Sequence, residues 1–222
     1  MVKLKKYFYG LLILLIAFTE VHAQRPHFYS NIQKFKSQDS VNFPPKHAIL
    51  FIGSSSFTKW TDVQDYFPAF TIINRGFGGS SLPDLIRYAD DIIFPYAPHQ
   101  IVIYCGENDF AASDTVSADL VFNRFKQLFQ LIRQRLPNTE VAFISMKPSP
   151  SRKKDRQKQA ACNSLIKNYL KEKKNTSFID VYHKMLNEDK TPIKEIFTKD
   201  SLHMNANGYK IWQKIIAPYL IK

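Results

Sequence analysis

From residue 48 onward, the chain alternates short apolar runs with longer segments of helical spacing. The runs read AILFIG, FTIIN, QIVIYCG, EVAFIS and SFIDV. Runs of this length that are apolar on both faces are typical of buried parallel strands. Apolar residues recur at helical spacing over about 56–66, 81–94, 116–136, 155–173 and 205–217. This alternation predicts an α/β fold, a three-layer α/β/α domain in which helices cover both faces of a doubly wound parallel sheet.

The size and composition of the chain fit one globular domain. It has 222 residues, of which 45% are hydrophobic and 14% aromatic, so it can bury a substantial core. Seven glycines and no low-complexity tract exclude a fibrous or disordered chain. We therefore expect residues 47–222 to form a single domain.

The first 23 residues have the pattern of a signal peptide. A basic start, MVKLKK, precedes the apolar stretch YFYGLLILLIAF, and VHA then precedes Gln24. Because this stretch of about 12 residues is shorter than the roughly 20 that cross a bilayer, cleavage is favoured over an uncleaved anchor. No other segment of the sequence is long and apolar enough to span a membrane. The sequence thus predicts cleavage near Ala23 and Gln24, with export to the periplasm or the cell exterior.

Residues 24–46 carry an aromatic-bearing helical pattern that ends at Pro44 and Pro45. The double proline gives a stiff lead into the first strand. We expect this segment to be an N-terminal arm that packs on the domain. The alternative is a tail that binds a partner.

The chain is strongly basic, with a net charge of +12, or +10 once three lysines and Glu20 leave with residues 1–23. Much of the excess lies in residues 151–174, where an apolar stripe predicts an amphipathic helix with a solvated basic face. The stripe consists of Ala161, Leu165, Ile166, Tyr169 and Leu170. No nucleic-acid recognition motif accompanies this segment, so no nucleic-acid partner is expected. Attraction to an anionic polysaccharide or membrane surface stays open.

The two cysteines and six histidines do not indicate a disulfide framework or a metal site. Cys105 follows an apolar run and is expected to be a buried apolar residue, whereas Cys162 falls in a predicted helix. A bridge between them is disfavoured. The histidines are scattered without zinc-ligand spacing, so neither a metal nor another cofactor is expected.

Polar loops follow the first three predicted strands. They read GSSS at 53–56, NRGFGGSS at 74–81 and GENDF at 106–110. Since ligands bind outside the carboxyl ends of parallel strands, these loops are expected to converge on one site. The three consecutive serines of the first loop are candidate nucleophiles. A nucleophilic serine needs a base and an orienting acid.

Two Asp-x-x-His stretches could supply that acid and base: Asp180 with His183, and Asp200 with His203. In each, the spacing lets one turn present both side chains to the same side. The apolar periodicity continues beyond Asp180, so His183 is expected in a packed segment. His203 instead precedes Asn205, which can cap the last predicted helix. Asp200 and His203 are therefore the preferred pair.

Four blocks resemble, in the same order, those of the SGNH hydrolases, also called GDSL-type esterases and lipases. They are GSS in place of Gly-Asp-Ser, NRGFGG, GEND as Gly-x-Asn-Asp, and DSLH as Asp-x-x-His. The resemblance covers most of residues 47–217. Within the family, the chain is similar to the branch of the platelet-activating-factor acetylhydrolase catalytic subunits. This resemblance implies the flavodoxin-like SGNH hydrolase fold.

The resemblance also implies a role for each block. Ser55 would be the nucleophile, His203 the base and Asp200 the acid that orients the imidazole. The oxyanion would be held by the backbone N–H groups of Ser55 and Gly79 and by the side-chain amide of Asn108.

Neighbouring residues have less specific expectations. Ser54 stands where many members have aspartate, and Ser56 is expected to cap the start of the following helix. Asn74 is expected to brace its loop, and Asp109 to bond loop backbone. Residues 147–152, KPSPSR, follow the fourth strand and are expected to shape the pocket. Three loop residues are open between lining the entrance and plain packing: Arg75, Phe77 and Glu107.

These inferences predict an exported serine esterase that hydrolyses small acyl esters, above all O-acetyl esters, through an acyl-serine intermediate. The substrate is expected to be a small-molecule or glycan ester. The rival predictions are a thioesterase or lysophospholipase-type lipase, and a non-catalytic glycan- or surface-binding protein. The intact set of Ser55, Asp200, His203 and Asn108 weighs against the non-catalytic alternative. The oligomeric state stays open.

Overall fold

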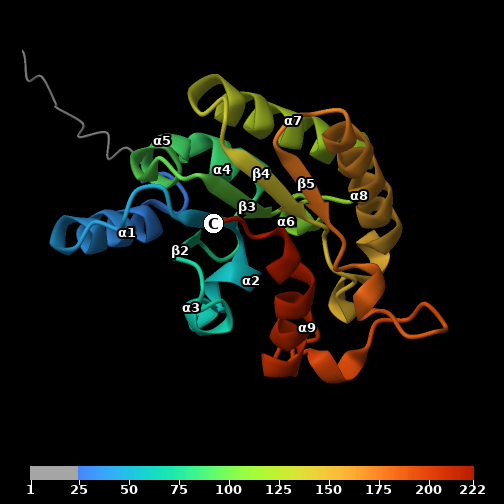
Figure 1. Ribbon diagram of the computed structural model, residues 1–222. Helices are drawn as coiled ribbons and strands as arrows, with labels where there is room; N and C mark the ends of the chain where they lie inside the picture. The colour runs from blue at the N-terminus through green and yellow to red at the C-terminus, as the bar shows by residue number, and fades with distance from the viewer. Residues whose placement is uncertain (1–24) are drawn as a thin grey trace, which may run out of the picture.

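The computed structural model describes residues 25–222, and the predicted signal peptide lies outside this range. At the centre is a sheet of five parallel strands in the order β2-β1-β3-β4-β5 (Figure 1). The strands are β1 (Ile49–Gly53), β2 (Ile72–Gly76), β3 (Gln100–Tyr104), β4 (Glu140–Ile144) and β5 (Thr176–Ile179). This is the flavodoxin-like strand order, so the predicted doubly wound fold is confirmed.

Helices cover both faces of the sheet (Figure 1). One face carries α1 (Tyr29–Val41), α4 (Leu82–Arg87), α5 (Ala89–Ile92), α7 (Ala118–Arg135) and α8 (Arg156–Lys171). The other carries α2 (Ser55–Thr58), α3 (Val63–Tyr66) and α9 (Ala206–Ile216), while α6 (Glu107–Ala111) directly follows β3. Among the helices of residues 25–222, none has the length and apolar character to cross a membrane.

The three central strands, β1, β3 and β4, are buried on both faces, which explains their continuous apolar runs. Along β3, Ile101 and Ile103 pack into one core, while Val102 between them packs into the other. Cys105 and Cys162 lie in the first of these cores as free, buried thiols. The disfavoured disulfide is therefore not formed.

Two side chains shift the first helices and the second strand from their predicted bounds. The helix predicted over 56–66 is split into α2 and α3, because Asn74 Nδ2 donates to the Phe57 carbonyl at 2.8 Å near the end of α2. Asn74 thus braces its loop, as predicted. Gln64 accepts the backbone N–H of Ile72 at 3.0 Å, and β2 begins there, two residues later than predicted.

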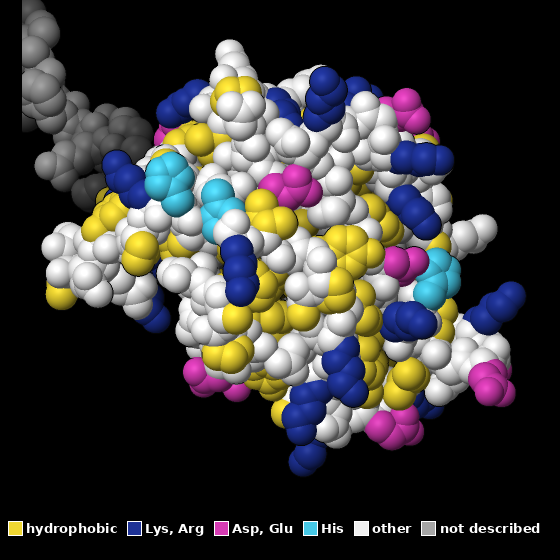
Figure 2. Space-filling model, viewed as in Figure 1, with side chains coloured by type: hydrophobic (Ala, Val, Ile, Leu, Met, Phe, Trp, Pro, Cys, Tyr) yellow, Lys and Arg dark blue, Asp and Glu magenta, His cyan; other side chains and the backbone are white. Residues whose placement is uncertain are grey.

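The basic helix forms as α8, but its buried face differs from the predicted stripe. Cys162, Ile166 and Leu170 are buried, whereas Ala161 is exposed. The helix is turned because Asn163 is also buried, where it bonds the backbone N–H and carbonyl of a residue just beyond β4. Figure 2 shows lysine and arginine side chains distributed across one face of the molecule, without a single continuous basic patch.

The N-terminal segment lies against the domain through α1. Ile32 is 1% exposed and belongs to the core on that side of the sheet. Asp39 forms an ion pair with Arg75 and accepts the Tyr96 hydroxyl at 2.6 Å. These contacts hold α1 against the domain.

Candidate active site

The strand order places the candidate site where the sheet changes its winding direction. β1 lies between β2 and β3, so successive connections run toward opposite edges of the sheet. Ligands of doubly wound sheets bind in the crevice outside the carboxyl ends of the strands at this point. Ser54–Ser56 follow β1, and Glu107–Asp109 follow β3.

Gly53 sets the direction of the first loop. Its φ is +149°, and a Cβ there would lie 1.9 Å from the Tyr104 carbonyl oxygen. Only glycine fits this close approach between neighbouring strands. The chain then turns at once into α2, whose first residue is Ser55, so this serine stands at the carboxyl edge of the sheet.

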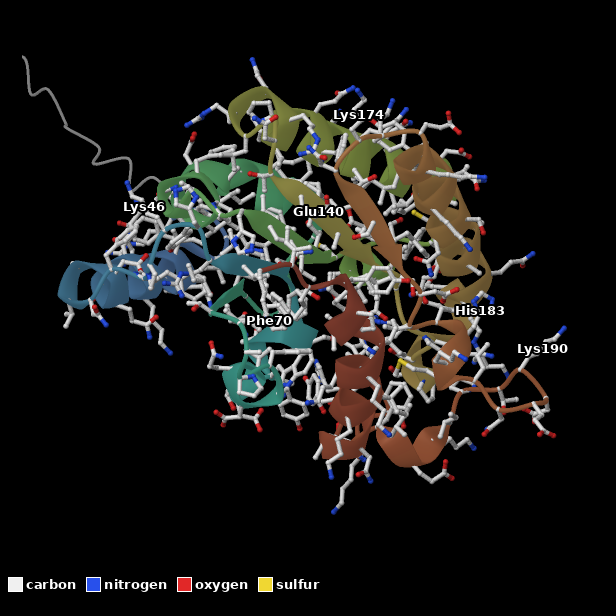
Figure 3. The ribbon with its side chains drawn as sticks, in the orientation of Figure 1. Lys46, Phe70, Glu140, Lys174, His183 and Lys190 are labelled. Carbon is white, nitrogen blue, oxygen red and sulfur yellow. The ribbon has the colours of Figure 1, made fainter. Side chains whose placement is uncertain are left out.

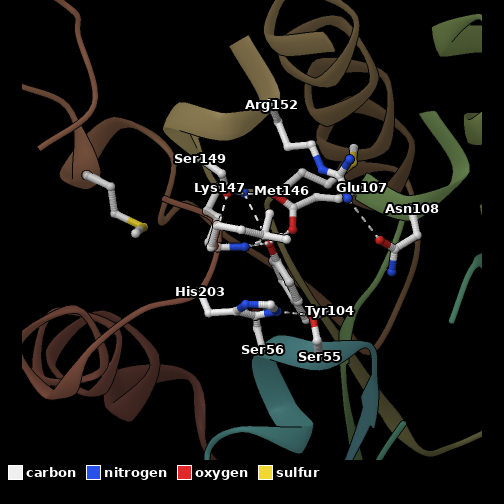
Figure 4. Close-up of polar contacts among 12 residues, drawn as sticks. Ser55, Ser56, Tyr104, Glu107, Asn108, Met146, Lys147, Ser149, Arg152 and His203 are labelled. Atoms are coloured by element: carbon white, nitrogen blue, oxygen red, sulfur yellow. Dashed lines mark hydrogen bonds and ion pairs between the residues drawn. The ribbon is translucent and has the colours of Figure 1, made fainter. Parts of the chain in front are cut away.

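Ser55, His203 and Asp200 form a hydrogen-bonded series. Ser55 Oγ lies 2.9 Å from His203 Nε2 (Figure 4), and His203 Nδ1 lies 2.6 Å from Asp200 Oδ2. Asp200 Oδ1 also accepts the backbone N–H of His203 at 2.9 Å, so one carboxylate holds both the ring and its turn. The fold brings the predicted serine and the preferred pair together although 148 positions separate Ser55 from His203.

The loop around His203 is held on both sides. Thr198 donates its hydroxyl to Asp200 Oδ1 at 2.7 Å and its backbone N–H to the His203 carbonyl at 2.8 Å. Asn205 caps α9 by accepting two backbone N–H groups, as predicted. The hydrogen bond from His203, with others from backbone N–H groups and Thr198, holds the pKa of Asp200 well below its usual range. Asp200 is therefore ionised at neutral pH and able to orient the imidazole.

Each of the three predicted oxyanion donors has an N–H group that makes no hydrogen bond within residues 25–222. Within residues 25–222, neither the Ser55 nor the Gly79 backbone N–H makes a hydrogen bond. Gly79 has a φ of +89°, a left-handed conformation that glycine adopts without strain. Asn108 Nδ2 donates one hydrogen to the Ser80 carbonyl at 2.9 Å, which leaves its second N–H available.

A family model described as the GDSL-like Lipase/Acylhydrolase family matches residues 40–211. The match spans most of the chain and includes all four blocks. The chain belongs to the GDSL-like lipase/acylhydrolase family. The resemblance drawn from the blocks is confirmed at the level of the family.

Solved structures share this acylhydrolase fold. A structure described as a platelet activating factor from Streptococcus pneumonia is 23% identical, with a TM-score of 0.74 over 86% of this chain and 92% of that chain. A candidate acylhydrolase from Bacteroides fragilis is 25% identical, with a TM-score of 0.72 over 86% and 96%. A catalytic mutant of an acetylxylan esterase from Geobacillus stearothermophilus is 15% identical, with a TM-score of 0.62 over 78% and 94%.

One curated protein also resembles this GDSL-like acylhydrolase in sequence. N-acylneuraminate cytidylyltransferase of Escherichia coli O18:K1:H7 is 25% identical over 197 residues. The match covers 87% of this chain and 45% of that protein, so the chain spans about half the length of the curated relative it matches.

The second Asp-x-x-His stretch of this GDSL-like acylhydrolase forms a separate pair. His183 Nδ1 lies 2.7 Å from Asp180 Oδ2, but His183 Nε2 makes no hydrogen bond within residues 25–222. The His183 side chain is 76% exposed, and Figure 3 shows it at the surface. The segment around His183 is packed, since Val181 and Met185 are buried, but the short 3₁₀ helix His183–Met185 turns His183 itself outward.

Two loop residues that could have lined the entrance pack elsewhere. Arg75 is 8% exposed and bonds an aspartate of α1, and Phe77 is fully buried. Asp109 accepts the Leu82 backbone N–H at 3.0 Å, as predicted, and also pairs with Arg124 at 2.8 Å. Burial raises the pKa of Asp109, and these two partners oppose that rise.

The prediction that Ser56 caps the first helix was wrong. Ser54 occupies the N-cap position of α2, which begins one residue earlier than predicted. Ser56 is 1% exposed, and its hydroxyl has no hydrogen-bond partner in the part of the chain that the structure describes. Of the three serines, only Ser55 forms a hydrogen bond with His203.

The sequence reasoning missed a buried polar cluster beside Ser55 and His203 (Figure 4). Lys147 is 1% exposed, and its Nζ lies 2.8 Å from Glu107 Oε2, which also accepts the Tyr104 hydroxyl at 2.6 Å. Ser149 Oγ lies 3.3 Å from Glu107 Oε1 and 3.4 Å from the Leu202 carbonyl. The cluster therefore ties the loops after β3 and β4 to the loop that carries His203.

Glu107, which was open between lining the entrance and packing, is buried in this cluster. A signal was present, because Glu107 and Lys147 each lie three residues beyond the ends of adjacent parallel strands, β3 and β4. Burial, together with the charge of Glu107, raises the pKa of the Tyr104 hydroxyl well above its usual value. Tyr104 therefore remains protonated and donates to the carboxylate.

Proposed function

We propose that this protein is an exported serine esterase that hydrolyses small acyl esters, with O-acetyl esters of carbohydrates as the leading substrate class. The observation that carries the proposal is the 2.9 Å contact of Ser55 Oγ with His203 Nε2, whose other ring nitrogen bonds Asp200. Family membership supports ester hydrolysis, and the signal-like pattern of residues 1–23 supports export.

The proposed reaction has two stages, acylation of Ser55 and hydrolysis of the acyl-serine, and His203 transfers protons in both. His203 takes the proton from Ser55 Oγ as that oxygen attacks the ester carbonyl carbon. The oxyanion receives hydrogen bonds from the Ser55 and Gly79 backbone N–H groups and from Asn108 Nδ2. His203 gives the proton to the leaving alcohol, which leaves an acyl-serine. Water, deprotonated by His203, then attacks this ester, releases the carboxylic acid and restores Ser55.

The carbohydrate acceptor is proposed from two supports. The acetylxylan esterase with the same fold is named for acetyl groups on a polysaccharide, which makes acetylated xylan a useful first polymer to test. An exported enzyme would also meet extracellular glycans rather than cytoplasmic thioesters.

The test compares ester hydrolysis by the purified protein, Ser55→Ala and Ser56→Ala on 4-nitrophenyl acetate, butyrate and octanoate, and on acetylated xylan. Acetate is expected to react fastest, and Ser55→Ala to lower kcat by at least about 10⁴-fold. Ser56→Ala is the matched control, since it removes a buried hydroxyl next along the chain that does not bond His203. Circular dichroism checks that the variants are folded.

The same panel, extended by an acetyl thioester, separates the rival functions. Full activity in Ser55→Ala would overturn the nucleophile. Preference for octanoate would favour a lysophospholipase-type lipase, and faster turnover of acetyl thioesters would favour a thioesterase. A folded protein that hydrolyses none of these substrates would favour a non-catalytic binding protein.

A further inference from the structure

Arg152 enters the candidate site from the segment that follows β4. It lies at a kink within the 3₁₀ segment Pro150–Asp155, and its Nη2 is 3.5 Å from Asn108 Oδ1 (Figure 4). The backbone around it is held in place, because Ser151 N–H donates to the Ser201 carbonyl at 3.0 Å and Arg152 N–H to the Ser149 carbonyl at 3.0 Å. Arg152 therefore projects from a segment fixed to the loop of His203.

Several other charged groups close to Ser55, Asn108 and His203 have partners. Lys147 pairs with Glu107 at 2.8 Å, and Arg124 pairs with Asp109 at 2.8 Å. Asp200 is ionised but receives hydrogen bonds from the His203 ring, from backbone N–H groups and from a threonine hydroxyl. Their charges are thus locally compensated.

Arg152 is different, because it has no carboxylate within 4.0 Å among residues 25–222. Its one hydrogen bond there, to Asn108, is at the long limit for such a bond. Its Nε is buried without a partner, while the side chain as a whole is half-buried. A partly desolvated guanidinium with unfilled donors is a strong receptor for a carboxylate or a phosphate, which it binds through two parallel hydrogen bonds.

We propose that Arg152 is a specificity-determining residue that binds an anionic group, a carboxylate or phosphate, on the ester substrate. This inference rests on the proposed esterase function and narrows its substrate to acyl esters that carry a negative charge close to the scissile bond. The simpler role for Arg152 is to hold the Asn108 amide in the orientation that an oxyanion donor needs. The two roles differ in one measurable respect: orientation of Asn108 serves every ester equally, whereas anion binding favours charged esters.

The test uses two pairs of esters that differ in charge. On the acyl side, 4-nitrophenyl hydrogen succinate is compared with 4-nitrophenyl butyrate. On the alcohol side, 4-acetoxybenzoate is compared with 4-acetoxybenzamide. Values of kcat/KM are measured for the wild type, Arg152→Gln and Arg152→Lys, with Lys153→Gln as the matched control for loss of one positive charge from an exposed neighbour.

In at least one pair, Arg152→Gln is expected to lower kcat/KM for the anionic ester at least tenfold more than for its neutral partner, mainly through KM. The pair that responds shows whether the anion belongs to the acyl group or to the alcohol. Arg152→Lys is expected to fall between the wild type and Arg152→Gln, because it keeps the charge but loses the planar fork. An equal fall in both members of each pair, or an equal effect of Lys153→Gln, would overturn the proposal.

A binding measurement separates failure of this inference from failure of the esterase assignment. Titration calorimetry compares 4-acetoxybenzoate and 4-nitrophenyl hydrogen succinate on Ser55→Ala with Ser55→Ala/Arg152→Gln. The dissociation constant of at least one ester is expected to rise at least tenfold when Arg152 is replaced. An unchanged dissociation constant for both esters overturns anion binding, whether or not the wild type hydrolyses them.

Discussion

Two Asp-x-x-His pairs of the same chain have nearly the same local geometry and different surroundings. The carboxylate–imidazole distance is 2.6 Å in Asp200–His203 and 2.7 Å in Asp180–His183. In each, the histidine backbone N–H also bonds the aspartate Oδ1. The two pairs differ at the other ring nitrogen of the histidine. His203 Nε2 bonds Ser55 Oγ, whereas the His183 side chain is 76% exposed.

This comparison shows that three-residue spacing is enough to build an Asp–His pair but does not by itself place a serine beside it. Each turn orients its own imidazole through contacts that are local in sequence. A serine must come from elsewhere in the chain, and of the two pairs only Asp200–His203 bonds one within residues 25–222. Four predictions test this contrast between the two Asp–His pairs.

The largest effect is expected from removing each imidazole. His203→Ala removes the proposed base and should lower kcat on 4-nitrophenyl acetate by on the order of 10⁴- to 10⁶-fold. His183→Ala, which removes the corresponding group of the exposed pair, should change kcat by less than about twofold. Initial rates of the two purified variants decide the matter, and equal losses would mean that the second pair takes part in the reaction.

Removing the negative charge from each pair should lower kcat less than removing the imidazole does. Again only the Asp200–His203 pair should respond. Asp200→Asn leaves His203 without its ionic partner and with a changed tautomer preference, so kcat should fall by about 10³- to 10⁴-fold. Asp180→Asn is the matched control and should retain wild-type rates. A fall of less than tenfold for Asp200→Asn would show that the Thr198 and backbone contacts alone orient His203.

The third-largest effect is expected from removing a proposed oxyanion donor. Asn108→Ala removes one proposed oxyanion donor and should lower kcat by on the order of 10² to 10³, with little change in KM. Asn207→Ala, on the exposed side of α9, controls for loss of an amide. A change confined to KM would indicate that Asn108 binds the ground state rather than the oxyanion.

The smallest effect concerns stability and pH. Since the folded state lowers the pKa of Asp200, its contribution to stability is present above the ordinary value of about 3.9 and is lost as pH falls below it. The urea midpoint of Asp200→Asn should therefore drop less between pH 5 and pH 3 than that of the wild type. The difference should be modest, because the Asp200 side chain is 47% exposed. Parallel pH profiles would contradict the assigned hydrogen bonds.

Periodicity and loop chemistry alone predict much of this architecture. Doubly buried strands require unbroken apolar runs, and a parallel sheet requires a helix between strands, so the α/β fold could be read from spacing. The preference for Asp200 and His203 came from the helix cap that follows them, and the choice of Ser55 came from the family blocks. Helix limits were less predictable, because the side chains of Asn74 and Gln64 interrupt an otherwise helical pattern.

By itself, the sequence determined the layers of the sheet, the carboxyl edge that carries the polar loops, and both Asp–His pairs, because these depend on contacts close along the chain. Only the tertiary structure decided which pair meets a serine, that Lys147 is buried against Glu107, and that Arg152 stands beside Asn108 with no carboxylate of residues 25–222 within 4.0 Å. These facts depend on how loops from distant strands converge on one edge. Burial and charge compensation there are properties of the assembled site, which no local spacing encodes.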